Sequence, residues 1–251
     1  MTWAGKRKFL YIFIFLIIFL AITIPIFYSI YPKPSCFDGK QNQDEKGVDC
    51  DGGCQKVCLE RTTPLQILWT RSFKVSDGVY SAVSYISNSN FNLGAKDVPY
   101  IFKLYDDRNI LIEERRGFAT ILPNTDFPIF EGVITTGNRT PKRAFFEFIG
   151  GPDFERLDSQ PELRIKNSIL GESDGRPRLS ASVVNESIFS VKDISLVAIL
   201  YDQKDTAIAA SQTVIDEISK GSSKEVIFTW PEPFKSAVGR IEIYPKVFLG
   251  R

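Results

Sequence analysis

The sequence predicts a mainly β protein in which two tandem β-sandwiches follow one N-terminal transmembrane helix. Three observations predict it: an uncharged apolar run near the N-terminus, four cysteines in the segment after it, and a remainder that alternates short apolar runs with turn residues. The chain has 251 residues, of which 43 % are hydrophobic and 13 % aromatic. This is enough apolar material for a folded core, so disorder of the whole chain is excluded.

The segment from Phe9 to Ile30 contains no charged residue. As a helix it would reach about 33 Å, which is one bilayer crossing, so we expect a transmembrane helix over residues 9–31. Lys6, Arg7 and Lys8 precede the segment, and the positive-inside rule therefore predicts a cytoplasmic tail over residues 1–8. A single-pass plasma-membrane protein with its C-terminus outside follows. The alternative is a cleaved signal peptide, but its apolar core is usually only about 7–15 residues and ends in a small-x-small site, which is missing here.

All four cysteines lie just after this helix, in a collar that we expect to cover residues 32–62: Cys36, Cys50, Cys54 and Cys58. An even number of cysteines directly outside a membrane indicates two disulfides, although three pairings are open. A four-cysteine zinc site is the alternative. Its usual two-residue gaps are absent, because the gaps here are thirteen, three and three residues.

The collar is also rich in oxygen ligands, which calcium prefers. The candidate calcium ligands are Asp38, Asn42, Asp44, Glu45, Asp49 and Asp51. The segment resembles a motif of bacterial secreted and surface proteins, C-x-D-G-x-x-N-x-x-E-x-G-x-D-C-x-G-x-C, itself similar to calcium-binding aspartate-rich repeats. Asp51 departs from it, because a glycine is usual there. The alternative is a disulfide-closed polar spacer with solvated acidic residues, since no full EF-hand loop is present. No other cofactor is expected.

From Pro64 onward, helical periodicity is weak, and short runs rich in β-branched and aromatic residues predict strands. The runs in the first part are 79–86, 100–106, 109–116, 127–135 and 144–149. Those in the second part are 178–184, 194–202, 206–214, 224–230 and 239–245. Strands at roughly ten-residue spacing with turn signals between them are typical of two-sheet sandwiches.

The two parts form an internal repeat with a period of 96 residues. Lys96-Asp97 matches Lys192-Asp193, and Ile112 matches Ile208. Fixed spacing over several positions indicates a tandem duplication. We therefore expect one sandwich over residues 63–149, a linker over 150–161 and a second sandwich over 162–251.

A short string recurs at this spacing: Phe102, Leu104, Tyr105 and Asp106 in the first repeat, and Leu200, Tyr201 and Asp202 in the second. It resembles the FxLYD domain of bacterial and archaeal surface proteins, although Ala198 replaces the phenylalanine in the second repeat. The resemblance implies an immunoglobulin-like fold outside the cell and no established reaction or ligand.

The string also has a structural explanation. Phe102 and Leu104 share one strand face and would enter the core, because side chains alternate along a strand. Asp106 and Asp202 each stand where a strand ends and would form a turn. We therefore expect these aspartates to be structural residues and not a catalytic pair.

No catalytic residue is expected, since the chain has no histidine and no visible nucleophile with its base. Lys and Arg number 31 against 30 Asp and Glu, which argues against nucleic-acid binding. Without Lys6, Arg7 and Lys8 the exterior has a net charge of −2, so electrostatics does not identify a partner. We expect a membrane-anchored module that presents its sandwiches to an extracytoplasmic protein or envelope polymer. The alternative is an accessory subunit of an envelope complex, held through its helix.

Overall fold

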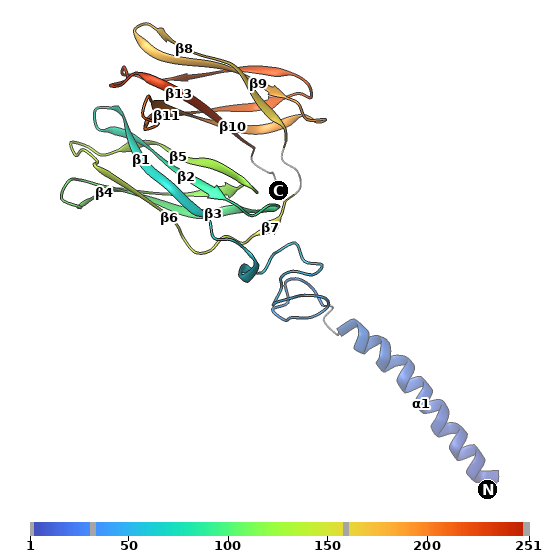
Figure 1. Cartoon of the computed structure of the whole chain (residues 1–251). Coiled ribbons are helices and arrows are strands. Elements are labelled where there is room, and N and C mark those ends of the chain that lie inside the picture. Colours follow the sequence, from blue (N-terminus) through green and yellow to red (C-terminus); the bar gives the residue numbers. More distant parts are fainter. Residues whose placement is uncertain (1–2, 31–33, 158–160, 248–251) are drawn as a thin grey trace. The chain divides into compact units, whose positions relative to one another are not determined.

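The chain is mainly β, with 55 % strand and 11 % helix, as the sequence predicts. The computed structural model describes residues 3–30, 34–157 and 161–247 (Figure 1). The chain divides into two compact units, Met1–Cys54 and Gln55–Arg251. The first holds the helix and most of the cysteine-rich segment, and the second holds all the strands.

The helix α1 covers Trp3–Ile30. Within it, Lys8–Tyr28 is long and apolar enough to cross a membrane: its mean hydropathy is 2.9, and none of its most apolar window is buried. The Thr23 hydroxyl donates to the Phe19 carbonyl at 2.8 Å, so this polar group is satisfied inside the helix. The helix is suited to a lipid environment on all sides, although a signal sequence has the same features. Residues 31–33, at the end of the predicted span, lie outside the described residues.

The second unit consists of thirteen strands and a short 3-10 helix, η1 (Leu59–Arg61). The strands of its first half are β1 (Gln66–Ser76), β2 (Val79–Asn88), β3 (Leu93–Tyr105), β4 (Leu111–Ile121), β5 (Thr125–Thr135), β6 (Arg143–Phe148) and β7 (Glu155–Arg156). Those of its second half are β8 (Leu163–Ser173), β9 (Arg176–Asn185), β10 (Val191–Asp202), β11 (Ala207–Ile218), β12 (Ser223–Thr229) and β13 (Val238–Val247).

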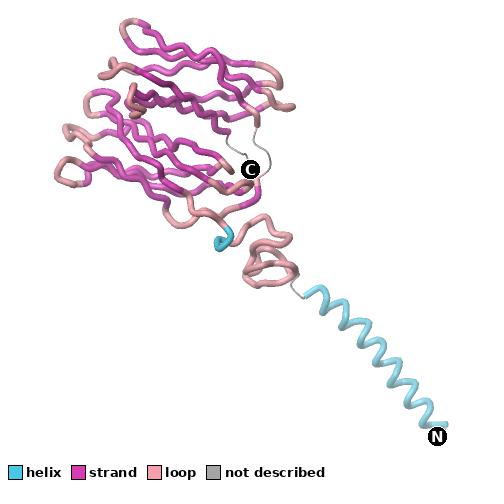
Figure 2. Tube along the Cα trace, viewed as in Figure 1, coloured by secondary structure: helices cyan, strands magenta, loops and turns pink. Residues whose placement is uncertain are grey.

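Each half contains two antiparallel sheets with the same strand order. In the first half the orders are β1-β2-β5 and β4-β3-β6, with β7 paired to β3. In the second half they are β8-β9-β12 and β11-β10-β13. Figure 2 shows that strands make up most of both halves. All ten predicted strands are present. The sequence pattern does not predict β1, β7 or β8. Of these, β1 and β8 are edge strands with many exposed residues, which weakens their apolar pattern.

The repeat of 96 residues extends to the backbone conformation. Asp97 and Asp193 both adopt the left-handed region, with φ of 50° and 51°. Asn109 and Asp205, also 96 residues apart, adopt it at 61° and 56°. Asn and Asp are the non-glycine residues that tolerate this region best, so the two halves use compatible residues where the chain must turn.

Each half has its own apolar core between its two sheets. The first core includes Phe102, Leu104, Ile121 and Phe146, all at most 2 % exposed. The second includes Leu179, Leu196, Leu200 and Phe228, all at most 1 % exposed. The predicted inward face of β3 is therefore confirmed.

The first core draws in residues on both sides of the predicted first sandwich. Val57, predicted in the collar, is 5 % exposed in this core, and its N–H donates to the Phe154 carbonyl at 2.8 Å. Phe154, predicted in the linker, is 2 % exposed in the same core. The first half therefore begins before residue 63 and extends beyond residue 149, because these two flanking segments pair with each other. Residues 158–160 of the predicted linker lie outside the described residues.

A third apolar cluster joins the two halves. It packs Phe73, Val83 and Phe130 of the β1-β2-β5 sheet against Val197, Ile199, Tyr201 and Ala210 of the β11-β10-β13 sheet. The second unit is thus a stack of four sheets with three apolar layers between them (Figure 1). This layer fixes one half against the other and creates surfaces that neither half has alone.

Candidate functional site

All four cysteines form disulfides, as predicted. Cys36 pairs with Cys54, 18 residues away, and Cys50 pairs with Cys58. The structure thereby selects one of the three pairings that the sequence left open. The Cys36–Cys54 bond lies inside a loop with almost no regular structure, where cross-links replace a hydrophobic core.

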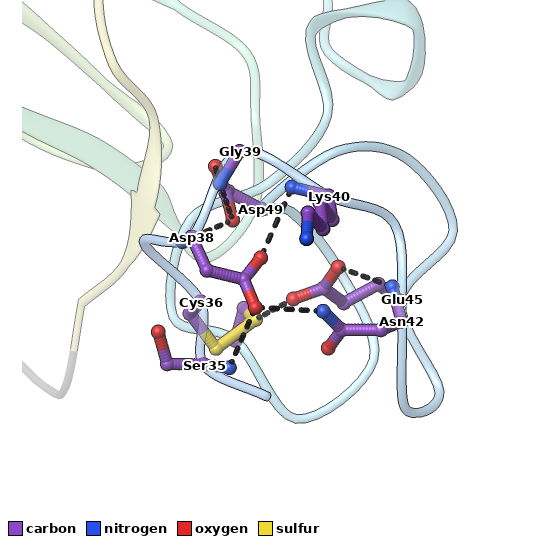
Figure 3. Close-up of a disulfide and its surroundings, with 9 residues drawn as sticks. Ser35, Cys36, Asp38, Gly39, Lys40, Asn42, Glu45 and Asp49 are labelled. Carbon is purple, nitrogen blue, oxygen red and sulfur yellow. Dashed lines mark hydrogen bonds between the residues drawn. A yellow bond between two sulfur atoms is a disulfide. The ribbon is translucent and has the colours of Figure 1, made fainter. Parts of the chain in front are cut away.

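The acidic side chains around this disulfide hold the loop through backbone N–H groups (Figure 3). Asp49 accepts from the N–H of Asp38 at 3.0 Å and from that of Gly39 at 2.9 Å. Asp38 accepts from the Asn42 amide at 2.8 Å and from the Lys40 N–H at 3.0 Å. The Asn42 side chain, followed by the backbone N–H groups that donate to Asp38, lowers the pKa of this carboxyl. These carboxylates act as acceptors for a tight turn.

The other candidate ligands are placed differently from one another. Glu45 is 7 % exposed and accepts from the Asn42 N–H at 3.1 Å, whereas Asp44 is exposed. Asp51 is 2 % exposed and has φ of 60°. Aspartate tolerates this left-handed conformation better than most non-glycine residues. The structure therefore does not turn all six candidate ligands toward one point.

One cluster of metal-ligand atoms lies within the collar: the sulfurs of Cys36 and Cys54 and a carboxylate oxygen of Glu45, all within 4.8 Å of one another. Both sulfurs are in a disulfide, so neither is the thiolate that binds metals. The Glu45 Oε1 atom lies 3.3 Å from the Cys54 sulfur, which has no proton to donate. This cluster does not have the chemistry of a metal site.

The repeated Leu-Tyr-Asp string forms two matching turns. The Oδ1 atom of Asp106 accepts from the N–H groups of Arg108 and Ile110, and that of Asp202 accepts from those of Lys204 and Thr206, at 2.8–3.0 Å. In each repeat the two donors follow the aspartate by two and four residues. The Arg139 side chain, followed by the backbone N–H groups, lowers the pKa of Asp106. The backbone N–H groups of Thr206 and Lys204 lower the pKa of Asp202. Each aspartate therefore holds the turn that follows its strand.

The tyrosines of the string differ between the repeats. Tyr105 is partly exposed, whereas Tyr201 is 4 % exposed between the two halves. The Arg240 guanidinium lies 3.9 Å from the Tyr201 ring centroid, and burial raises the pKa of this tyrosine to about 12. The second tyrosine therefore contributes to the contact between the halves.

A groove with a volume of about 680 Å³ runs beside this contact. Four segments line it: residues 70–75 of β1, 141–144 at the start of β6, 207–209 of β11, and 230–236 between β12 and β13. Both halves contribute, so the groove exists only because the halves are stacked. Small-molecule and polymer sites occur preferentially at such junctions.

The charges in the groove are of mainly one sign. Arg71, Lys74, Lys142, Arg143 and Lys235 line it, against a single carboxylate, that of Glu232. Lys74 pairs with Asp77 at 2.6 Å and with Glu232 at 3.6 Å. Among the described residues, none of the other four cations has a carboxylate within ion-pair distance. Sequence reasoning missed this cluster, because it comes from three segments far apart in the chain.

Comparisons with known proteins identify no family for this chain. No family model matches it, and no curated protein matches it either. Among solved structures, a transglutaminase from red sea bream matches with 11 % identity and a TM-score of 0.26 over 75 % of this chain. This chain spans only 30 % of the length of that enzyme. A likeness this weak carries no argument about function.

Proposed function

We propose that this protein is a membrane-anchored module whose second unit binds an extracytoplasmic partner, either a protein or an envelope polymer. In this proposal α1 spans the plasma membrane, residues 1–8 are cytoplasmic and the C-terminus lies outside. Each half of the second unit is an immunoglobulin-like β-sandwich of the FxLYD kind. No nucleic acid takes part, and the activity is binding instead of catalysis.

The observation that carries this proposal is an apolar helix followed within a few residues by a disulfide-bonded loop. Disulfides persist in oxidising compartments, so the loop belongs outside the cytoplasm. The cations that precede the apolar segment belong inside. Both arguments give the same orientation, although they rest on different chemistry.

The sandwich interpretation is supported by the strand order. In each half the first, second and fifth strands form one sheet, while the fourth, third and sixth form the other. The two sheets enclose an apolar core. Facing antiparallel sheets with this alternation are typical of immunoglobulin-like domains.

The non-catalytic interpretation is supported by the role of the aspartates. Asp106 and Asp202 recur at one repeat position, and both accept from backbone N–H groups of their own turns. The groove presents cations and apolar side chains, a combination that binds anionic groups.

Protease protection in intact cells tests the orientation. An impermeant protease should remove the second unit and leave a fragment containing α1. The untreated chain should show no free thiol on a non-reducing gel. Protection of the whole chain would contradict the proposed orientation.

The alternative is an accessory subunit of an envelope complex, held through α1 itself. An exchange of residues 9–30 for an unrelated apolar helix of equal length distinguishes the binding module from the accessory subunit. The proposed module keeps its surface partner after the exchange. An accessory subunit held through α1 loses its complex.

A further inference from the structure

We propose that the groove between the two halves binds an anionic polymer that carries phosphate or carboxylate groups along its chain. This inference rests on the proposed binding function and names its ligand class. Three features of the groove support it: its positive charge, the hydrogen-bonded backbone that carries the cations, and the apolar side chains that line it.

The charge of the groove contrasts with that of the whole chain. Five cationic side chains and one carboxylate line it, whereas the complete chain has a net charge of only +1. A cleft lined by one sign of charge focuses the field and raises the local concentration of opposite charges. Arg71 is close enough to Asp202 to lower the pKa of that carboxyl, but their separation exceeds ion-pair distance. Most of the positive charge is therefore available to a ligand.

Three of the cationic residues lie on backbone that hydrogen bonds already order. Arg71 pairs with Val83 in the first sheet, and Arg143 pairs with Tyr105 in the second. The Lys142 N–H donates to the Tyr105 carbonyl at 2.8 Å. Binding thus orders side chains but no loop at these positions, which keeps the entropic cost low.

Lys235 lies in the segment between β12 and β13, which two prolines stiffen. Pro231 and Pro233 each fix one φ angle close to −65°. Before them, the Trp230 indole donates to the Ala210 carbonyl at 3.2 Å, and the Trp230 N–H donates to the Pro177 carbonyl at 3.1 Å. The wall supplied by the second half is therefore anchored to β11 and β9.

Apolar side chains also line the groove. Phe73 is 7 % exposed and Trp230 is 6 % exposed, while the Phe234 ring meets Trp230 edge to face at 5.2 Å. Small anions use charge alone and gain nothing from such a surface. A polymer with ring or alkyl carbon between its anionic groups can contact both the cations and this surface.

Spacing also favours a polymer. The cations come from β1, from the start of β6 and from the β12–β13 segment, so no single pair of neighbouring residues provides the charge. A ligand with one anionic group meets only part of the set. A ligand with repeated groups engages several cations at once and releases their counterions, which makes binding steeply dependent on salt.

The test is binding by the full chain in neutral detergent. The probes are a polyphosphate chain and a polygalacturonate chain, with inorganic phosphate, galacturonate and neutral dextran for comparison. We expect both polyanions to bind, the monomers to bind far more weakly and dextran not to bind. A preference between the two polyanions identifies whether phosphate or carboxylate is the natural group.

Charge reversal locates the site. The double variant Lys142→Glu with Arg143→Glu should lower polyanion affinity at least about tenfold and reduce its salt dependence. The matched control is Arg108→Glu with Lys220→Glu, which makes the same change in net charge at two exposed turn residues outside the groove. Circular dichroism confirms that both variants fold.

The outcomes are distinct. Equal losses in the two double variants mean that net charge alone attracts the polymer and overturn the proposed groove site, and so does unchanged binding in the groove variant. Equal binding of monomers and polymers overturns the polymer assignment. Because the assay takes place in detergent, a failure here leaves the orientation test by protease protection unaffected.

Discussion

The Tyr244 hydroxyl on β13 lies 3.0 Å from the Tyr85 hydroxyl on β2, 159 residues earlier in the chain. Tyr244 donates to the Glu242 carboxylate, and Trp69 stacks on Tyr85 with a centroid separation of 5.5 Å. Burial, followed by the hydrogen bond to Glu242, raises the pKa of Tyr244, so this hydroxyl stays protonated at neutral pH. The contact joins the second strand of the first half to the last strand of the second half.

The second half does not repeat the apolar surface that the first half presents at the interface. Asn88 and Asn185 are buried, and each donates its side-chain amide to two backbone carbonyls of its own half. When these two asparagines are aligned, Ser180 and Ser182 of the second half take the positions of Val83 and Tyr85 in the first half. The apolar surface on which the second half packs is therefore absent from the second half itself.

A charge placed between the halves should break the stack. Ile199 is fully buried there, so Ile199→Asp should lower the free energy of unfolding by about 4 kcal/mol. Val214→Asp is the matched control, since Val214 is 69 % exposed on the neighbouring strand and should change stability by less than about 0.5 kcal/mol. Chemical denaturation followed by tryptophan fluorescence measures both. Similar losses in the two variants would contradict this account of the interface.

The buried Asn185 should be needed for folding of the second half. Its amide donates to the carbonyls of Phe189 and Ile218 at 2.8 and 3.0 Å, and its oxygen accepts from the Ser187 N–H at 3.0 Å. Asn185→Ala leaves these groups unpaired and should cost about 3 kcal/mol. The exposed Asn138→Ala serves as control. A neutral effect of Asn185→Ala in thermal unfolding would mean that water replaces the amide.

The turn aspartates predict a defined response to substitution. Asp202→Asn keeps an acceptor oxygen but loses the charge, so it should lower the melting temperature less than Asp202→Ala, which removes the acceptor for Lys204 and Thr206. Equal losses in the Asn and Ala variants would show that the charge, and not the acceptor oxygen, matters.

These aspartates also predict acid sensitivity. The pKa values of Asp106 and Asp202 are lower in the folded chain than their usual 3.8. The unfolded chain therefore binds protons first as the pH falls, and the stability from these groups, complete above about pH 5, is lost below about pH 4. Acid titration of the unfolding midpoint measures this effect, and the Asp106→Asn, Asp202→Asn double variant should show a shallower decline. An identical decline in both chains would assign it to other carboxylates.

The first disulfide should stabilise the collar locally. Cys36 and Cys54 are separated by 18 positions in the sequence, and removal of a cross-link over a loop of this size costs about 3 kcal/mol in the chain-entropy account. In the Cys36→Ser, Cys54→Ser double variant we expect rapid proteolysis between residues 36 and 54, with the β-sheet circular dichroism unchanged. Loss of that β signal would show that the collar is required by the second unit.

Calcium titration tests the remaining interpretation of the acidic loop. Because Asp38, Asp49 and Glu45 already accept backbone N–H groups, we expect the loop to be ordered without the ion and the titration of the full chain to give no heat. A heat signal with a rise in melting temperature, both lost in Asp44→Asn, would restore calcium as a structural ion. Asp44 suits this test because its side chain is exposed and its replacement disturbs no hydrogen bond of the described loop.

Local patterns determined much of this protein. The uncharged run predicted α1, alternating residues predicted the central strands, and the recurrence of Leu-Tyr-Asp predicted two matching halves. These features depend on neighbours within a few residues, so they are visible in the sequence. One signal of the stack was also present in the sequence, because residues 194–201 contain no charged side chain. All of them are buried along β10, as a strand covered on both faces must be.

Tertiary structure alone decided which surfaces meet. Nothing in the sequence pairs Tyr85 with Tyr244, or brings Arg71, Lys142 and Lys235 to one groove, because each segment is ordinary by itself. The near-neutral composition indicated that charge would not identify a partner, whereas the folded chain concentrates positive charge at one place. Net charge is a sum over the chain, but a ligand responds to the local field, and that field depends on which strands lie side by side.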